Sequence, residues 1–219
     1  MRGTSGVTTP FDANQVAPRL AADPRVNKVP EKRVELFFVR EFLGAEECAT
    51  LCGLIDQERR PSTIADDNGQ EAFRTSETCD LDHDHPLVAS VNGRLSELTG
   101  IPEVLGEPIQ GQRYAVGQEF KPHTDTFNPG GPDYYEHCAD MGQRTWTAML
   151  FLNAPEAGGA TRFKTLGKNI RPETGKLLLW NNLKPDHRPN DFTLHQGLPV
   201  RKGTKYIITK WYRELPSGV

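Results

Sequence analysis

Two stretches in the first half of the chain repeat apolar residues with the period of an amphipathic helix. The first runs from about Ala45 to Arg59 and places four apolar side chains on one face, namely Cys48, Leu51, Cys52 and Ile55. The second begins at Pro86 and ends before Gly100, since proline suits the first turn of a helix and glycine the residue just past its end. Its apolar stripe consists of Leu87, Val88, Val91, Leu95 and Leu98. The pattern predicts two helices, with a short strand at Val34–Val39 before them and a polar loop from Arg60 to about Asp80 between them.

After residue 108 the period changes, and short strand-like runs alternate with turns rich in Gly, Pro and Asn. The runs are Ile109–Val116, Thr145–Asn153, Ala160–Thr165, Lys176–Trp180 and Lys205–Tyr212. This spacing is typical of an all-β sandwich or barrel rather than of alternating strand and helix units. Helices first and strands second predict a fold that is mainly β with flanking helices, a jelly roll with the N-terminal helices packed on one sheet.

The length of 219 residues suits one domain, with or without a tail. Residues 1–30 are polar and interrupted by prolines, and we expect them to form a flexible N-terminal tail. Residues 31–219 would then form a single domain, in which 31–108 are a helical support and 109–219 the jelly-roll core.

The charges of the chain are mixed in sign along its length, and they sum to −3. No long basic run points to nucleic acid or to an anionic membrane, and no apolar run is long enough to span a bilayer. Met1–Pro10 lacks the apolar stretch of a signal peptide, so we place the protein in the cytoplasm by default. The oligomeric state cannot be read from the sequence, and a homodimer is one candidate assembly.

The four cysteines do not form the pattern of a disulfide framework. Cys48 and Cys52 are predicted to be buried on a helix face, where cysteine behaves as a small apolar residue. Cys79 and Cys138 lie in loop-like stretches and receive no role.

His123-Thr124-Asp125 is the only His-x-Asp in the chain. On a strand, residues two apart point to the same face, so an imidazole and a carboxylate can converge on one ion. Pro122 supports the extended conformation because it disfavours helix at Lys121. His195 lies in a second strand-like stretch, Phe192–Gln196. Two histidines and one carboxylate on one side of an ion form the facial triad of non-haem iron(II) oxygenases, which leaves other positions open.

Lys205 follows His195 by ten residues, after a Gly-Leu-Pro turn and Gly203. A hairpin returning from His195 would bring this lysine beside the metal strand, where a buried ammonium needs an anionic partner such as a cosubstrate carboxylate. The alternative is a solvated surface lysine. Ile207 and Thr209 alternate with Tyr206 and Ile208, so the periodicity by itself does not decide between the two.

The remaining histidines are interpreted without a ligand role. His83 and His85 stand in Asp82-His83-Asp84-His85 just before the second helix, where a metal clip is one interpretation. We favour the other, in which Asp84 and its neighbours cap the helix N-terminus. His137 and His187 fall in polar stretches and are predicted to be solvated.

Residues 126–143 form a long polar segment directly after two of the proposed metal ligands. Such a segment inside a compact domain is usually functional or disordered. We interpret it as a mobile lid whose Tyr134 and Tyr135 pack on a peptide substrate, with a plain surface insertion as the alternative.

The stretch Gln112–Tyr212 resembles the catalytic domain of the prolyl 4-hydroxylase family of 2-oxoglutarate/iron(II) dioxygenases, of the compact bacterial or algal type. The matching pieces run in family order and cover roughly half of the chain. They are Arg113-Tyr114 with Gly117, His123-Thr124-Asp125, Arg144 and the strand ending Leu150-Phe151-Leu152-Asn153, Gly158-Gly159-Ala160-Thr161-Arg162-Phe163, Pro172-x-x-Gly175, His195-Gln196-Gly197-Leu198-Pro199-Val200, and Gly203-Thr204-Lys205-Tyr206.

The resemblance implies a double-stranded β-helix with iron(II) held by His123, Asp125 and His195. It also implies 2-oxoglutarate and O2 as cosubstrates, with ascorbate as reductant. Lys205 would pair with the distal carboxylate of 2-oxoglutarate, helped by the hydroxyl groups of Tyr114 and Thr161.

Substrate-side residues follow more loosely from the resemblance. Arg74 lies in a segment that borders the substrate groove in the family, and Arg144 is expected to face that groove too. Phe120 replaces a common aromatic hydroxyl, and Tyr206 replaces a common tryptophan; both positions are near the substrate in the family.

Three functions are therefore weighed. The first is 4-hydroxylation of proline in a peptide or protein, with release of succinate and CO2. The second keeps the chemistry but acts on a free amino acid or another small molecule. The third is a non-catalytic jelly-roll binding module, which the complete triad and Lys205 disfavour. The presence of Asp125 favours hydroxylation over halogenation, because related halogenases lack this carboxylate.

Overall fold

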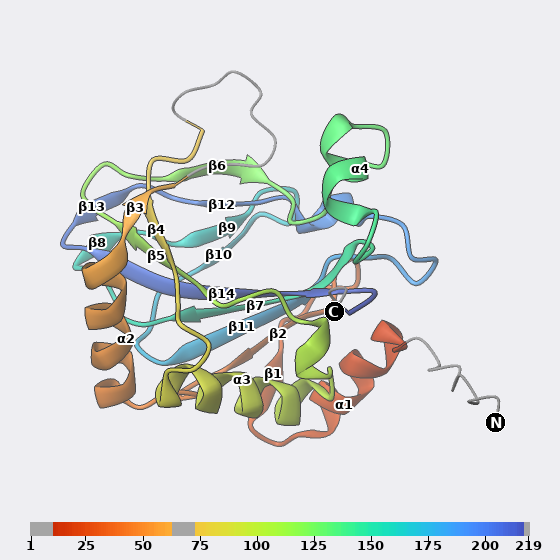
Figure 1. Cartoon of the computed structure of the whole chain (residues 1–219). Coiled ribbons are helices and arrows are strands. Elements are labelled where there is room, and N and C mark those ends of the chain that lie inside the picture. Colours follow the sequence, from red (N-terminus) through yellow and green to blue (C-terminus); the bar gives the residue numbers. More distant parts are fainter. Residues whose placement is uncertain (1–10, 63–72, 217–219) are drawn as a thin grey trace.

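Two β-sheets face each other in the computed structural model of the protein, which describes residues 11–62 and 73–216 (Figure 1). The major sheet contains, in spatial order, β1 (Val26–Lys28), β2 (Leu36–Val39), β11 (Lys176–Asn181), β7 (Arg144–Phe151), β14 (Lys205–Arg213), β5 (Gln110–Tyr114), β4 (Glu77–Asp80) and β3 (Arg60–Pro61). The minor sheet contains β10 (Lys168–Ile170), β9 (Thr161–Phe163), β12 (His195–Gly197) and β6 (Phe120–His123), and a separate pair joins β13 (Val200–Lys202) to β8 (Ala157–Gly158). The predicted jelly roll, mainly β with flanking helices, is confirmed.

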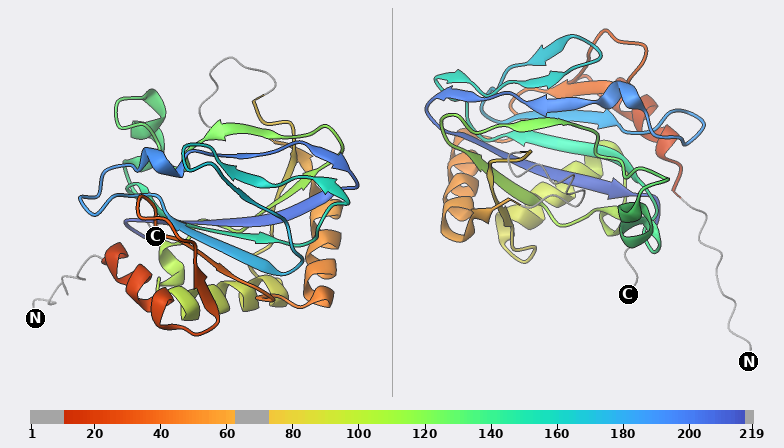
Figure 2. Two further views of the ribbon diagram at one scale, coloured as in Figure 1. Left: turned by 180° about the vertical axis from the view of Figure 1, so that it is seen from behind. Right: turned by 90° about the horizontal axis from the view of Figure 1, so that it is seen from above.

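The helices α1 (Val16–Ala22), α2 (Ala45–Glu58) and α3 (Pro86–Thr99) lie against the outer face of the major sheet, away from the minor sheet (Figure 2). Both predicted long helices are thus confirmed to within a residue or two. A fourth helix, α4 (Pro132–Cys138), stands apart from this layer, and short 3-10 turns occur at Ala13–Gln15, Glu103–Leu105 and Asp191–Thr193. No helix of the described chain has the length and apolar character needed to cross a membrane.

Alternation along β7 shows how one strand serves two hydrophobic cores. Its residues Trp146, Ala148 and Leu150 belong to the core under the helices. Met149 and Phe151 belong to the second core, between the two sheets. Because successive side chains of a strand point to opposite faces, β7, covered on both faces, is buried from Thr145 to Phe151. The pocket described below opens into the second core.

The ends of α3 follow the sequence signals, with one correction. Pro86 occupies the first turn, and Gly100 ends the helix in a left-handed conformation with φ of 74°. The side chain that caps the N-terminus is His85, whose Nδ1 accepts a hydrogen bond from the Leu87 amide. Capping by Asp84 and its neighbours is therefore confirmed for His85 but not for Asp84, which lies one residue before the N-cap.

The first thirty residues differ from the flexible tail that we expected, although residues 1–10 lie outside the described chain. Val16, Ala17 and Leu20 of α1 are buried, and the indole of Trp146 donates a hydrogen bond to the Ala13 carbonyl at 3.1 Å. A short apolar stripe therefore suffices to dock this segment on the core. β1 then pairs with β2 as the first strand of the major sheet.

The support formed by residues 31–108 is also less purely helical than expected. β2, β3 and β4 come from this half of the chain and join the major sheet. β3 and β4 lie at the two ends of the stretch 60–80, which we predicted to be a loop, and residues 63–72 between them lie outside the description. Pairing with β5 orders β4, a stabilisation that local sequence does not reveal.

Candidate metal centre and adjoining pocket

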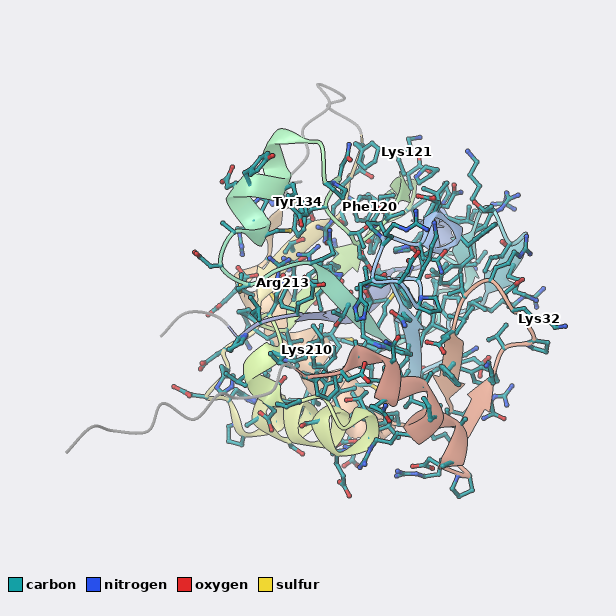
Figure 3. The ribbon with its side chains drawn as sticks, turned by 90° about the vertical axis from the view of Figure 1, so that its right-hand side faces the viewer. Lys32, Phe120, Lys121, Tyr134, Lys210 and Arg213 are labelled. Atoms are coloured by element: carbon teal, nitrogen blue, oxygen red, sulfur yellow. The ribbon has the colours of Figure 1, made fainter. Side chains whose placement is uncertain are left out.

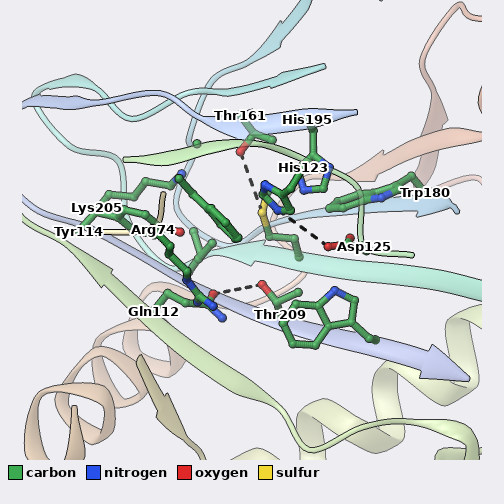
Figure 4. Close-up of a pocket in the computed structure, with 15 residues that line it drawn as sticks. Arg74, Gln112, Tyr114, His123, Asp125, Thr161, Trp180, His195, Lys205 and Thr209 are labelled. Atoms are coloured by element: carbon green, nitrogen blue, oxygen red, sulfur yellow. Dashed lines mark hydrogen bonds and ion pairs between the residues drawn. The ribbon is translucent and has the colours of Figure 1, made fainter. Parts of the chain in front are cut away.

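The three proposed ligands come together at one end of the minor sheet (Figure 4). His123 ends β6 and His195 begins β12, and the two are direct partners across this antiparallel pair. Asp125 follows His123 by two residues. One donor atom from each residue lies within 4.8 Å of the others, and His123 Nε2 is 4.0 Å from Asp125 Oδ1. The predicted stretch Phe192–Gln196 is only partly a strand, because Asp191–Thr193 forms a 3-10 turn before His195.

Both imidazoles are oriented by their own backbone. His123 Nδ1 is 2.8 Å from the Lys121 carbonyl oxygen, and His195 Nδ1 is 2.9 Å from that of Thr193. A carbonyl oxygen can only accept, so each Nδ1 carries a hydrogen, and in the neutral ring Nε2 then holds the lone pair. Burial, and then the neighbouring His195, lower the pKa of His123 to about 3, which keeps its ring in the neutral form that binds metals.

Asp125 is equally constrained. Thr147 Oγ1 donates a hydrogen bond of 2.6 Å to Asp125 Oδ2, and Arg144 Nη1 approaches the Asp125 carbonyl oxygen at 3.4 Å. Burial acts to raise the pKa of this carboxyl group, but the facing imidazoles, Arg144 and the Thr147 hydroxyl outweigh it, so the pKa lies below its usual range. Two imidazoles and one carboxylate form a donor set that fits iron(II) with several positions open.

A pocket extends from these ligands to Lys205 (Figure 4). Lys205 is 1% exposed, and its Nζ lies 5.0 Å from the centre of the Tyr114 ring and 5.5 Å from that of Phe151. No carboxylate of the described residues pairs with it, and burial lowers its pKa to about 7. The surface alternative is therefore wrong, and the buried position favoured by the hairpin argument is the observed one.

The other two residues expected near the cosubstrate also line this pocket. Tyr114 is the cross-strand partner of Lys205, and Thr161 lies on β9 of the opposite sheet. Both are at least 97% buried. Gly159 lies close to the Lys205 side chain, and a Cβ added there would be 3.2 Å from the lysine Cδ. Its φ of 70° also favours glycine.

Arg74 also lines the pocket. Its guanidinium donates to the hydroxyls of Ser76 and Thr78 and to Gln110 Oε1, at 3.0–3.2 Å. It also lies 4.9 Å from the Phe120 ring centre, and Phe120 in turn stacks on His123 with ring centres 3.6 Å apart. Phe120, which stands where the family commonly has an aromatic hydroxyl, thus puts an apolar ring directly against a proposed metal ligand.

Arg144 does not line the pocket. Its guanidinium forms two hydrogen bonds of 2.7 Å with the carboxylate of Glu107 and stacks 4.1 Å from the centre of the Trp211 ring. Trp211 does line the pocket, so Arg144 supports the pocket wall from behind. The expectation that Arg144 faces the groove is corrected accordingly.

Tyr206 lies on the opposite face of the sheet from the pocket. Its hydroxyl donates to the Asp56 carboxylate at 2.9 Å and accepts from Arg113 at 3.2 Å, beside α2. Because strand side chains alternate, Lys205 inside places Tyr206 outside. Tyr206 therefore lies outside the pocket, contrary to expectation, and its contact with a substrate stays a prediction.

The segment 126–143 is less irregular than expected, because it contains α4. The side chain of Gln143 joins the two ends of this segment. It accepts a hydrogen bond from the Phe127 amide at 2.9 Å and donates one to the Phe127 carbonyl at 2.8 Å. Arg213 donates to the His137 carbonyl near the end of α4. Figure 3 labels Arg213 below α4, from which Tyr134 projects. His137 is half-buried against the Phe127 ring, so its expected solvation is only partial, whereas His187 is exposed.

Tyr134 and Tyr135 are neighbours on α4 with ring centres 6.0 Å apart, and neither lines the pocket. Tyr135 is 75% exposed. Their contact with a substrate remains a prediction.

Several pocket residues were not identified from the sequence. Their shared feature is an inward position on β5, β7, β11 or β14, and they are Gln112, Met149, Trp180, Ile207, Thr209 and Trp211. Thr147, which holds Asp125, was missed as well. The alternation of each strand was visible, but which face would be inside depended on strand pairing.

Comparison with known proteins agrees with this geometry. A family model described as the 2OG-Fe(II) oxygenase superfamily matches residues 109–213. The chain is 30% identical over 221 residues to Prolyl 4-hydroxylase 2 of Arabidopsis thaliana, an alignment that covers 89% of this chain and 72% of that protein. It is 32% identical over 143 residues to Prolyl 4-hydroxylase subunit alpha-1 of Gallus gallus, which covers 65% of this chain and 28% of the longer relative.

The chain thus spans little more than a quarter of the length of that animal relative. Among solved structures, the viral collagen prolyl hydroxylase vCPH from Paramecium Bursaria Chlorella virus-1, in complex with 2OG, superposes with a TM-score of 0.65. The two sequences are 27% identical, and the match covers 84% of this chain and 97% of the viral one.

Proposed function

The chain belongs to the prolyl 4-hydroxylase family of 2OG-Fe(II) oxygenases, and from this premise we propose that it hydroxylates proline in a peptide or protein. The overall reaction consumes 2-oxoglutarate and O2 and releases succinate and CO2; one oxygen atom enters succinate and the other enters the product hydroxyl. The observation that carries the proposal is one pocket holding both the His123, Asp125 and His195 donor atoms and the buried Lys205.

His123 Nε2, His195 Nε2 and Asp125 Oδ1 would hold the iron, since the other nitrogen or oxygen of each side chain is already hydrogen-bonded to protein. Bound iron(II), together with 2-oxoglutarate, supplies the oxidising power needed to replace a hydrogen on unactivated carbon. The chain itself contributes fixed donors, and the rings of Phe163 and Trp180 pack beside His195.

Lys205 would bind the distal carboxylate of 2-oxoglutarate. An ammonium that is 1% exposed and lacks a carboxylate partner in the described chain gains a charge-assisted hydrogen bond when this ligand enters. The hydroxyls of Tyr114 and Thr161 line the same end of the pocket and can donate to that carboxylate.

The substrate would enter on the side of Arg74, Phe120 and Trp211. Proline-rich peptides commonly bind in grooves lined by aromatic rings, and both Phe120 and Trp211 line the pocket. Arg74 would donate to a peptide carbonyl, and Tyr134 and Tyr135 of α4 would contact the peptide farther from the metal. The prolyl relatives named above support proline as the residue that is modified.

A free amino acid or other small carboxylic acid is the second candidate substrate. One observation favours it: the Arg74 guanidinium is hydrogen-bonded to three neutral side chains and pairs with no carboxylate of the described residues. A small acid could therefore place its carboxylate there.

Mass spectrometry of products separates these candidates. The protein is incubated with iron(II), ascorbate and 2-oxoglutarate, and with either proline-rich peptides or free amino acids. We expect proline in the peptide to gain one oxygen atom, with equimolar succinate, and no gain without 2-oxoglutarate or in His195→Ala. Oxidation of the free amino acid alone would select the second candidate. Absence of succinate and product with every substrate would favour a binding module.

A further inference from the structure

A chain of buried hydrogen bonds lies behind the metal-facing carboxylate. Asn182 Nδ2 donates to Thr147 Oγ1 at 2.8 Å, and Thr147 Oγ1 donates to Asp125 Oδ2 at 2.6 Å. Thr147 and Asn182 have no exposed surface, and Asp125 is 6% exposed. Asn182 Oδ1 has no hydrogen-bond partner in the described structure, so the side chain is held through its Nδ2 alone. Buried polar groups are costly unless they are paired, which favours keeping both hydrogen bonds of the chain.

The direction of donation in this chain is fixed by chemistry. An ionised carboxylate only accepts, and a threonine hydroxyl has one hydrogen to donate. The Thr147 hydrogen is therefore committed to Asp125, and its oxygen lone pair is free to accept from the Asn182 amide. If the Asn182 amide were turned over, its oxygen would face an oxygen whose hydrogen is already in use.

Asn182 is itself anchored by its backbone. Its amide donates to the Thr145 carbonyl at 2.7 Å, and its carbonyl accepts from the Asn190 amide at 2.9 Å. Asn182 directly follows β11, and Thr147 lies on the adjacent β7 opposite Trp180. The hydrogen-bond chain therefore connects Asp125 to two rigid strands of the major sheet, whereas both histidines come from the minor sheet.

We propose that Thr147 and Asn182 are positioning residues that hold Asp125 as a ligand through one oxygen. The inference rests on the proposed metal centre. With Oδ2 bound to Thr147, the carboxylate cannot turn both oxygens toward the ion, and Oδ1 remains on the side of His123 Nε2. One-oxygen ligation leaves more of the ion free for the cosubstrate, and partners of this kind tune metal affinity.

Thr145 provides a matched control for a purely structural role. It lies two residues before Thr147 on the same face of β7, is 4% exposed, and donates its hydroxyl to the Tyr212 carbonyl at 3.2 Å. Within the described residues, its hydroxyl forms no hydrogen bond with a side chain of the metal centre. Replacing either threonine with valine removes one buried hydroxyl from one strand, but only Thr147→Val releases Asp125.

The test is titration of the metal-free protein with Mn(II), with Co(II), and with Fe(II) in the absence of oxygen. Tryptophan fluorescence or visible absorption reports how much metal is bound. We expect Thr147→Val to weaken metal binding by about 10–100-fold, the usual effect of removing such a partner. Thr147→Ser keeps the hydroxyl and should restore wild-type affinity. Thr145→Val should bind metal as the wild type does, even if it unfolds at a similarly lower urea concentration.

Asn182 supplies variants that keep the inference testable if Thr147→Val does not fold. Asn182→Ala should weaken metal binding less than Thr147→Val, because the Thr147 hydroxyl can still donate to Asp125. Asn182→Asp should weaken it more than Asn182→Ala, because a second acceptor competes for the Thr147 hydrogen. Equal metal affinity in Asn182→Asp and the wild type, or in Thr147→Val and Thr145→Val, would overturn the inference.

These measurements use no proline substrate, so the two proposals fail separately. A wild-type protein that hydroxylates no proline but shows the expected order of metal affinities would retain the positioning role and lose the proposed function. If the wild-type protein hydroxylates proline but Thr147→Val and Asn182→Asp bind metal as the wild type does, the proposed function is retained and the positioning role is lost.

Discussion

The two ends of the pocket differ in how far the protein completes them by itself. At the metal end, each ligand side chain has its second polar atom bound to protein, as in the 2.8 and 2.9 Å contacts of the two histidine Nδ1 atoms. At the other end, the Lys205 ammonium is buried among the rings of Tyr114 and Phe151 and has no hydrogen-bond partner in the described chain.

The difference indicates two ways of preparing a site. The metal end is rigid before its ion arrives, so little order has to be gained on binding. The lysine end keeps an unmatched charge, which disfavours the ligand-free state and favours entry of an anion. The comparison predicts that changes at the metal end abolish loading of the ion, and that changes at Lys205 act on 2-oxoglutarate alone.

The largest expected effect comes from removing a metal ligand. His123→Ala, Asp125→Ala and His195→Ala should each abolish stoichiometric iron binding and turnover, because three protein ligands are the whole set that the described residues offer. Metal analysis after gel filtration and succinate release measure both. His187→Ala, at an exposed histidine, is the control and should retain one iron per chain. Full iron content and activity in His195→Ala would remove this residue from the metal centre.

Loss of the buried ammonium should be the next largest effect. Lys205→Ala leaves the distal carboxylate of 2-oxoglutarate unpaired, at a cost of about 3–5 kcal/mol. At about 1.4 kcal/mol for each tenfold change, 2-oxoglutarate should bind roughly 10²–10³-fold more weakly. Titration of 2-oxoglutarate into iron-loaded protein, followed by its visible charge-transfer band, measures the affinity.

Two variants serve as controls for this loss. Lys205→Arg keeps the charge and should weaken 2-oxoglutarate binding less than Lys205→Ala does, although the planar guanidinium is wider than an ammonium group. Lys164→Ala, at an exposed lysine near the same sheet, should change nothing. Iron affinity should stay at the wild-type value in all three. Near-normal 2-oxoglutarate affinity in Lys205→Ala would assign the clamp to another cation, with Arg74, which also lines the pocket, examined next.

A smaller effect is expected from pH. Burial lowers the pKa of Lys205 to about 7 in the ligand-free protein, so the ammonium is charged below that pH and loses its proton above it. Binding a dianion requires the charged form, so 2-oxoglutarate affinity should fall by up to about tenfold for each pH unit above this pKa. The same titration, repeated from neutral to alkaline pH, checks the slope. Lys205→Arg stays charged and should abolish this slope, whereas an equal slope in both proteins would refute the assignment to Lys205.

The smallest effect should come from Tyr206, the chain neighbour of Lys205 on the other face of β14. Tyr206→Phe removes the hydroxyl contacts with Asp56 and Arg113, which are partly exposed, and should lower the free energy of unfolding by about 1 kcal/mol or less. Turnover and KM should not change, as urea unfolding and steady-state assays would show. Tyr114→Phe is the inward counterpart and should raise the KM for 2-oxoglutarate. A raised peptide KM in Tyr206→Phe would return that residue to the substrate site.

Local patterns were sufficient for elements whose signals lie within a few residues. The period of apolar residues, Pro86 and Gly100 located α3 because helix ends depend on short-range geometry. Spacing by two predicted that His123 and Asp125 converge, and they do, although β6 ends at His123 and Asp125 lies just beyond the strand. The ordered motifs around them indicated the family. Patterns failed at α1 and β4, where ordering comes from contacts with distant strands.

The sequence by itself therefore determined the metal chemistry, the two long helices and the sandwich of short strands, since each depends on local spacing or on motifs. Only the tertiary structure decided which face of each strand is inside. Lys205 and Tyr206 are adjacent and equally plausible as inward residues until pairing with β5 sets the register. The same holds for Thr147, an ordinary strand threonine in the sequence that becomes the partner of Asp125 only because β7 passes beneath the end of β6. Long-range register and the close approach of two sheets are properties of the folded chain, and no local pattern encodes them.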